Sequence, residues 1–423
     1  MDSTERSSSD AGLSSSDKQE AERAILSRIL ILDGHSAATL AFTRSLGRAG
    51  HWVAVGFNRG LFAPAALSRY CKVSFEHPVS TDDANAFADS VAEFARQNSI
   101  ELIVPVTDWT TLPLARCLSR FENICPLVLP SRQSLEWAAD KYQTVELARS
   151  AGIAVPQTWL IRSPEDLATL PELPFPIVVK DRFSFRWANE RPVFGSVEYA
   201  YSRESLFQKA QDRLRKAGDV LVQGFVSGIG IGFSCFALKD GARLPFQWQR
   251  IREIDPRGSG SSSRKSVALD PQIADFSRAL ISKLGFQGIA MVEYKKESAT
   301  GKPVLMEVNG RPWGSIQLAI ASGIDYPRYV VDWYLKGATP PSEIAYQQGI
   351  TCRRIVGELT HLQNLRRGAP PQWPMPYPSY WGSLVKIAVP WYPGMRYDDL
   401  SLTDLRPGVA GIRNWFQMRL KKM

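Results

Sequence analysis

The sequence predicts a mixed α/β and α+β protein, in which a unit built on a parallel sheet precedes a larger α+β unit. Short apolar runs alternate with helical patterns over residues 28–132, which is typical of a parallel sheet covered on both faces. Residues 133–337 combine helices with longer strands and a hairpin signal at Asp240-Gly241. Residues 338–423 are rich in Pro, Trp and Tyr, so we expect an irregular C-terminal extension.

Length and composition narrow the class of protein. A chain of 423 residues is long for one core and favours two or three packed units. The net charge is +9, but no basic block is interleaved with aromatic residues, so we expect no nucleic-acid partner. The five cysteines form no CxxC pair, which argues against a zinc site or a disulfide framework. Residues 1–27 are polar and Ser-rich, and we expect a disordered tail rather than a secretory signal on a cytoplasmic protein.

The first unit opens with a βαβ pattern. An apolar run at residues 28–32 ends at Asp33-Gly34 and lacks the GxGxxG pattern of dinucleotide-binding folds. His35 and Asp108 follow strands of this sheet, at the edge where α/β sheets bind ligands, so each is either a substrate contact or an ordinary turn residue. The remaining elements expected in this unit are a helix up to residue 50, strands at 52–55, 102–106 and 127–130, and a helix at 83–98.

The second unit contains the motifs that carry chemistry. The helix expected at 133–151 has Lys141 near its middle, and the strand at 176–181 carries Lys180. The glycine-rich segment 228–232 is either functional or a flexible turn. The other elements expected here are strands at 219–223, 232–238, 244–251, 289–294 and 306–309, a mobile loop at 255–265, and helices at 271–285, 314–322 and 327–336.

A candidate metal site lies at the last two strands. Alternate residues of a strand point to the same face, so Glu307 and Asn309 present oxygens side by side. If the preceding strand pairs with theirs, Glu293 converges on them, and two carboxylates about 4 Å apart repel by roughly 4 kcal/mol at an effective dielectric near 20. Such a pair usually holds a cation or a shared proton, and these oxygens suit Mg²⁺.

Taken together, these motifs resemble the ATP-grasp superfamily, and within it the carbamoyl-phosphate-synthase-like branch of carboxylate–amine ligases. The resemblance covers residues 28–337 and implies a Rossmann-like domain at 28–132, followed by an ATP-grasp domain at 133–337 whose two subdomains clamp the nucleotide. The segments that carry the resemblance are 140–158, 222–228, 288–294 and 305–315, the last being the most specific.

The resemblance also implies roles for individual residues. Glu293, Glu307 and Asn309 would hold one or two Mg²⁺ ions, with Mn²⁺ as a substitute, and Arg311 would steady the transferring phosphoryl group. Four basic residues are candidates for closing over the acyl phosphate, and each could equally be a surface charge: Arg250, Arg252, Arg264 and Lys265. Of these four, we expect Lys265 to have this role. The residues implied to bind ATP are Lys141 and Lys180 at the phosphates and Gln223, Gly224, Phe225 and Val226 at the adenine. Two departures concern the adenine hinge and the ribose: Gly224 stands where a polar residue is common, and no glutamate follows in the glycine segment.

The resulting hypothesis is an ATP- and Mg²⁺-dependent ligase that activates a small-molecule carboxylate as an acyl phosphate and couples it to an amine-type nucleophile. One alternative is an ATP-binding protein without ligase activity that acts as a sensor or scaffold. The other is a peripheral membrane protein, because the basic helix expected at 409–422 combines Trp415 and Phe416 with Arg413 and Arg419, unless that helix docks on the body of the protein.

Overall fold

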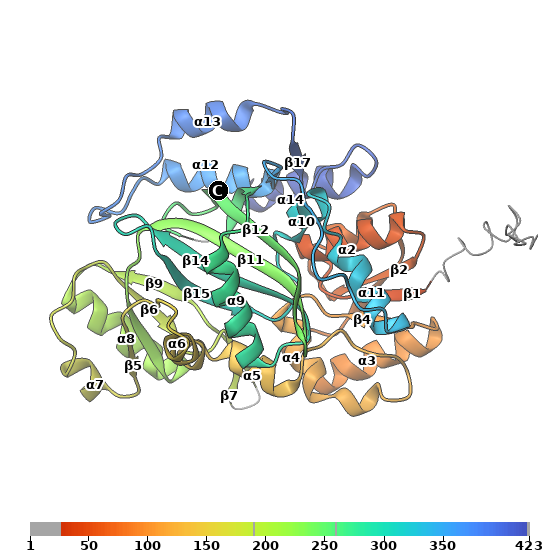
Figure 1. The fold of residues 1–423 in the computed structure, drawn as a ribbon, viewed down its shortest axis with the longest axis horizontal. Helices are drawn as coiled ribbons and strands as arrows, with labels where there is room; N and C mark the ends of the chain where they lie inside the picture. Colours follow the sequence, from red (N-terminus) through yellow and green to blue (C-terminus); the bar gives the residue numbers. More distant parts are fainter. Residues whose placement is uncertain (1–26, 189–190, 259, 421–423) are drawn as a thin grey trace, which may run out of the picture.

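The computed structural model describes residues 27–188, 191–258 and 260–420 (Figure 1). Within them, the strands form one seven-stranded sheet, two four-stranded sheets and a two-stranded hairpin. The seven-stranded sheet lies in the middle of the molecule, with the N-terminal unit on one side and the smaller subdomain on the other (Figure 1). The tail expected at residues 1–27 falls outside the described part of the chain, apart from its last residue.

The N-terminal unit is a parallel sheet, as predicted. Its strands are β1 (Arg28–Ile31), β2 (Trp52–Asn58), β3 (Cys71–His77) and β4 (Leu102–Val104), in the order β3-β2-β1-β4. Its helices are α2 (Ala37–Arg48), η1 (Pro64–Leu67), α3 (Ala84–Gln97), α4 (Asp108–Arg116) and η2 (Leu118–Arg120). Both faces of β1 are buried, since Ile29 and Leu30 belong to different hydrophobic clusters. The strand expected at 127–130 is only an isolated bridge from Leu127 to Ile103, and β3 is an addition to the predicted elements.

Two helices connect the first unit to the second, where the sequence predicted one. They are α5 (Arg132–Ala139) and α6 (Lys141–Ser150). Asp140 breaks the run because its backbone is extended, with φ −86° and ψ 96°, and its carboxylate accepts hydrogen bonds from the first amides of α6. Lys141 is therefore the first residue of α6 rather than a residue at the middle of a long helix.

The smaller subdomain is an antiparallel four-stranded sheet in the order β5-β10-β6-β9. Its strands are β5 (Thr158–Ile161), β6 (Ile177–Asp181), β9 (Val197–Ala200) and β10 (Val220–Gly224), and its helices are α7 (Pro164–Ala168) and α8 (Arg203–Ala217). A hairpin of β7 (Phe185–Ala188) and β8 (Arg191–Phe194) extends from it. Lys180 and Gln223 thus lie on the neighbouring strands β6 and β10.

The central sheet has the order β15-β14-β11-β12-β13-β16-β17. Its first strands are β11 (Gly228–Leu238), β12 (Gly241–Glu253), β13 (Ser261–Ser266), β14 (Gly288–Glu297) and β15 (Pro303–Asn309), with helices α9 (Pro271–Leu284), α10 (Ile316–Ala321) and α11 (Tyr326–Lys336). The hairpin at Asp240-Gly241 is confirmed. The mobile loop expected at 255–265 is wrong over its second half, because β13 pairs there with both β12 and β16.

The glycine-rich segment is part of β11 rather than a flexible turn. A Cβ atom at Gly232 would lie 2.2 Å from the Trp248 ring, and one at Gly230 would lie 2.5 Å from the Arg250 side chain. The missing side chains therefore let two large residues of β12 lie flat across β11. One of these two, Arg250, reaches the candidate site.

The C-terminal extension, expected to be irregular, is largely regular structure. It contains β16 (Thr351–Arg353), α12 (Ile355–Arg366), α13 (Tyr380–Ala388), β17 (Met395–Tyr397) and α14 (Arg406–Leu420). Because β16 and β17 complete the central sheet, the boundary predicted at residue 337 separates strands of one sheet. Residues 421 and 422, the end of the predicted basic helix, lie outside the described residues.

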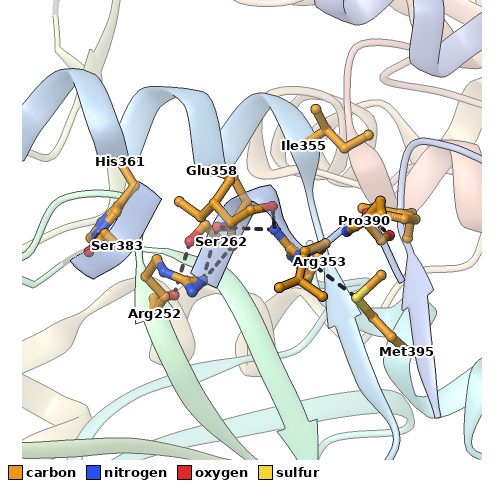
Figure 2. Close-up of polar contacts among 12 residues, drawn as sticks. Arg252, Ser262, Arg353, Ile355, Glu358, His361, Ser383, Pro390 and Met395 are labelled. Carbon is orange, nitrogen blue, oxygen red and sulfur yellow. Dashed lines mark hydrogen bonds and ion pairs between the residues drawn. The ribbon is translucent and has the colours of Figure 1, made fainter. Parts of the chain in front are cut away.

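Buried ion pairs hold this extension against the rest of the protein. Figure 2 shows the carboxylate of Glu358 on α12 between Arg252 and Arg353, with the Arg252 nitrogen 2.9 Å from its oxygen. Arg353 also donates to the carbonyls of Ile387 and Val389 at the end of α13, at 2.7 Å each. From the N-terminal unit, Arg44 donates to Asp404 at 2.9 Å. None of the helices in the described part of the chain is long and apolar enough to cross a membrane.

Candidate active site

A cavity of about 440 Å³ separates the small sheet from the edge of the central sheet. It is lined by residues from β6 and β10 on one side and from β14 and β15 on the other. The predicted site residues that line it are Lys141, Lys180, Gln223, Gly224, Phe225, Val226, Glu293, Glu307, Asn309 and Arg311. Residues far apart in the sequence therefore meet in one place.

The carboxylate end of the cavity has the strand geometry that the sequence predicts. Glu293 on β14 and Glu307 on β15 are direct partners in the antiparallel ladder. The amide of Asn309 donates a hydrogen bond of 3.0 Å to Glu307 Oε1, so the three side chains gather on one face. Burial raises the pKa of Glu293, and the neighbouring Glu307 adds to this, although Arg250 opposes the shift. A pair of carboxylates in this state favours a bound cation.

Arg250 is the main addition to this end of the cavity. Its guanidinium lies 2.6 Å from Glu293 Oε2 and 2.9 Å from Glu253 Oε1. The donor set otherwise consists of two carboxylates and one amide oxygen, which suits Mg²⁺ because this ion completes its shell with water and phosphate. No group of three or more His, Cys, Asp or Glu side chains that could hold a metal occurs among the described residues. Glu293, Glu307 and Asn309 would hold such an ion together with the phosphates of a ligand.

Two lysines bring positive charge to the cavity. The Lys141 ammonium, on the first turn of α6, donates to the Asp181 carbonyl at 3.3 Å. Burial lowers the pKa of Lys180 to about 7, and the charge of Lys141 contributes to this shift. Burial also lowers the pKa of Lys141, against the opposing effect of Glu307 and other carboxylates. The positive charge of Lys141 makes protonation of Lys180 less favourable. A polyanion bound between the two lysines would relieve that repulsion.

The other end of the cavity is flat and partly aromatic. The amide nitrogen of Gln223 donates to Thr158 Oγ1 at 2.7 Å, which leaves its oxygen as the acceptor for a ligand. Lys295 donates to the Val226 carbonyl at 2.9 Å and fixes the hinge. The Phe225 ring contacts Trp373 with centroids 5.3 Å apart. Trp373 comes from the C-terminal extension, and no sequence motif marked it as a neighbour of the hinge.

Arg311 is held by the N-terminal unit. Its guanidinium binds both carboxylate oxygens of Asp108, at 2.6 and 2.8 Å. Burial alone would raise the pKa of Asp108, but the charge and hydrogen bonds of Arg311 outweigh it, and the pKa is lowered. Asp108, which the sequence left as either a substrate contact or a turn residue, is thus the partner that orients Arg311 toward the cavity.

The comparison with protein families points to the same residues. The model described as "ATP-grasp in the biosynthetic pathway with Ter operon" matches residues 230–357. This stretch contains Glu293, Glu307, Asn309 and Arg311. The similarity to the ATP-grasp family thus covers residues 230–357, less than half of the chain.

Several known proteins are similar to this chain in sequence or in fold. The vancomycin/teicoplanin A-type resistance protein VanA of Enterococcus faecium is 27% identical over 204 residues, which is 44% of this chain and 56% of VanA. The chain thus spans about half the length of this curated relative. The L-amino acid ligase of Bacillus licheniformis superposes with a TM-score of 0.54 at 16% identity, covering 73% of this chain and 74% of that one. A biotin carboxylase domain of the Hydrogenobacter thermophilus 2-oxoglutarate carboxylase, solved with MgADP and bicarbonate, gives a TM-score of 0.57 at 14% identity, covering 77% and 72%.

Lys265 does not lie at the candidate site. It lies on β13, where its side chain is exposed and does not line the cavity. The neighbouring Arg264 points the opposite way, is 1% exposed and pairs with Asp398, while Arg252 pairs with Glu358. Of the four basic residues considered for closing over the acyl phosphate, Arg250 alone lines the cavity. The sequence could not separate them, because the alternation of β13 is visible only once that segment is known to be a strand.

Proposed function

We propose that this protein is an ATP- and Mg²⁺-dependent ligase that activates a small-molecule carboxylate as an acyl phosphate and joins it to an amine-type nucleophile. The observation that carries the proposal is one cavity in which the buried Lys180 and the half-buried Lys141 face a pair of carboxylates on adjacent strands. VanA and the L-amino acid ligase support it as relatives in sequence and fold. We further propose that it acts in the cytoplasm, where ATP is available.

The proposed chemistry begins with the phosphoryl group. A carboxylate is a poor electrophile because its leaving group would be oxide, whereas an acyl phosphate releases phosphate readily. Transfer of the γ-phosphoryl group needs positioning and charge neutralisation more than covalent help. Lys141 and Lys180 would bind the ATP phosphates, while Gln223 accepts a hydrogen bond from the adenine amino group. Mg²⁺ held by Glu293, Glu307 and Asn309 would neutralise charge on the β- and γ-phosphates.

Arg311 and Arg250 complete the proposed mechanism. Asp108 holds Arg311 in a fixed two-point contact, so its charge is preorganised toward the transferring phosphoryl group or the acyl phosphate. Arg250 pairs with Glu293 in the structure and lines the cavity, so its charge would also be available to the phosphoryl group. The amine then attacks the acyl carbon, and the carbon–oxygen bond to phosphate breaks. Phosphate leaves with the electron pair and takes up the proton that the amine nitrogen loses.

The test is release of ADP. The protein is mixed with ATP, Mg²⁺ and pools of amino acids and small carboxylic acids, and ADP and phosphate are measured together with the joined product. We expect ADP release that depends on both a carboxylate and an amine, and loss of that release in Glu307→Gln. Calorimetric binding of Mg-ATP without ADP release in any pool would instead favour a sensor or scaffold.

A further inference from the structure

A second cavity, of about 420 Å³, lies between the N-terminal unit and the C-terminal extension and shares no lining residue with the nucleotide cavity. Its walls come from α2 and η1 on one side and from α12 and α14 on the other. We propose that it is a binding site for an amphipathic organic anion, that is, a small molecule with an acidic group and an apolar body. This inference rests on the cavity itself and does not depend on the ligase reaction.

The charge of the lining favours an anion. Arg354, Arg367 and Arg419 face the cavity, against the single carboxylate of Asp399. The two oxygens of that carboxylate accept the Ile355 and Val356 amides at 3.2 and 3.4 Å, so it is used to anchor the start of α12. Three guanidinium groups thus border a cavity with one acid that is already engaged.

Arg367 and Arg419 bring positive charge to the same cavity. Burial lowers the pKa of Arg419, and the charge of Arg367 lowers it further. Arg419 donates to the neutral amide oxygen of Gln363 at 2.8 Å rather than to a carboxylate. An acidic group placed between Arg367 and Arg419 would remove this repulsion and gain charge-assisted hydrogen bonds.

The remaining wall of this cavity is largely apolar, and its Trp415 ring is held in place by a hydrogen bond. Trp415 donates through its indole nitrogen to Thr360 at 3.0 Å, which fixes its ring against α12, and the Arg419 guanidinium lies 3.7 Å from that ring's centroid. The other apolar side chains of the lining are Leu40, Phe62, Pro64, Val356 and Met418. A cation stacked on an aromatic wall beside aliphatic side chains suits a ligand whose acidic group adjoins an apolar body.

The sequence left α14 either as a membrane-surface helix or as a helix docked on the body of the protein. The side of α14 that carries Trp415 and Arg419 faces α12 and the cavity, as expected for a docked helix. At the far end of the cavity, the His35 ring lies 5.4 Å from Trp109, the residue next to Asp108. The proposed site therefore adjoins the layer of residues that orients Arg311.

The experiment uses 1-naphthyl phosphate as the ligand, measured by isothermal titration calorimetry on the full chain saturated with Mg-AMP-PNP. Saturation removes the nucleotide cavity from the measurement. We expect 1:1 binding that is at least tenfold weaker for uncharged 1-naphthol and for inorganic phosphate, since each lacks half of the recognition. Arg419→Gln should weaken binding by roughly tenfold or more, the scale of one hydrogen bond to a charged group.

Two further variants make the result decisive. Arg413→Gln is the matched control, because it removes the same charge from an exposed position of α14 that does not line the cavity. Gly411→Leu fills the cavity from the helix without changing charge, and its Cβ is accommodated 3.6 Å from Val356. It should abolish binding of 1-naphthyl phosphate while AMP-PNP affinity stays unchanged. Binding that is equal in wild type, Arg419→Gln and Gly411→Leu, or equal for 1-naphthol, would overturn the proposal.

Discussion

The buried charges at the two ends of the central sheet have different surroundings. At the β14–β15 end, burial lowers the pKa of Lys180 to about 7 and raises that of Glu293, so the protein leaves these charges incompletely compensated. At the β13–β16–β17 end, Arg264 and Asp398 are each 1% exposed and pair with one another. Perturbed groups that line a cavity indicate a site for ligands, whereas charges that pair with each other in a core indicate structure.

This contrast leads to separable effects of substitution. Removing a charge from the paired end should lower the free energy of unfolding with little direct effect on ligand binding. Removing one from the cavity end should impair binding or turnover and leave stability almost unchanged, because that charge was costly in the free protein. Substitutions at the two ends of the central sheet test this difference, beginning with the largest expected effect.

Asp398→Asn should be the most destabilising of these changes. It leaves the Arg264 guanidinium buried without its carboxylate, which typically costs about 3–5 kcal/mol. Urea denaturation of the protein checks this value. The matched control is Asp275→Asn, which breaks an exposed pair with Arg278 and should cost at most about 1 kcal/mol. Equal losses in the two variants would show that burial does not distinguish the two ends.

Glu293→Gln should mainly impair turnover rather than stability. We expect turnover to fall about 100-fold or more, the scale of losing one preorganised electrostatic contact at a transition state. Its free energy of unfolding should change by less than about 1 kcal/mol, since burial already disfavours the charged carboxylate. ADP release and urea denaturation measured on one preparation give both numbers. Full activity in this variant would remove the proposed role of the carboxylate pair.

The sequence predicted the cavity end well because strand alternation and motif spacing are local. Glu307 and Asn309 share a face whatever else the chain does, and pairing of β14 with β15 then brings in Glu293. The paired end could not be predicted this way. Arg264, Glu358 and Asp398 look like surface charges in the sequence, and only the distant contacts of the extension reveal that each is buried with a partner. For the same reason Trp373 was not recognised as a neighbour of the site, and the sequence did not pair Asp108 with Arg311.

Lys180 should couple nucleotide binding to protons. With a pKa of about 7, its amine is mostly neutral at pH 8, and phosphates bound beside it would restore the ammonium. ATP binding at pH 8 should therefore take up as much as about one proton, measured by calorimetry in buffers of different ionisation enthalpy. Lys180→Met should show no such uptake. Uptake that is the same in both proteins would assign the proton to another group.

The lowered pKa of Lys180 also determines how its contribution to the free energy of unfolding changes with pH. Because the pKa of Lys180 is lower in the folded protein than the usual value near 10.4, the unfolded chain binds more protons between about pH 7 and pH 10. The contribution of Lys180 to the free energy of unfolding therefore rises with pH across that window, and its cost is greatest below pH 7. Lys180→Met should gain stability relative to wild type at pH 6 and lose that advantage by pH 10.

Lys265→Ala should have the smallest effect of all. Its side chain is exposed on the face of β13 opposite to Arg264, and the cavity is lined instead by Arg250 from the neighbouring strand. Substitutions at exposed positions away from a binding site usually change the free energy of unfolding by less than about 0.5 kcal/mol. Turnover of Lys265→Ala should change less than about twofold. Arg250→Ala is the informative comparison, measured by the same ADP assay. Loss of activity in Lys265→Ala but not in Arg250→Ala would contradict the roles assigned to these two residues.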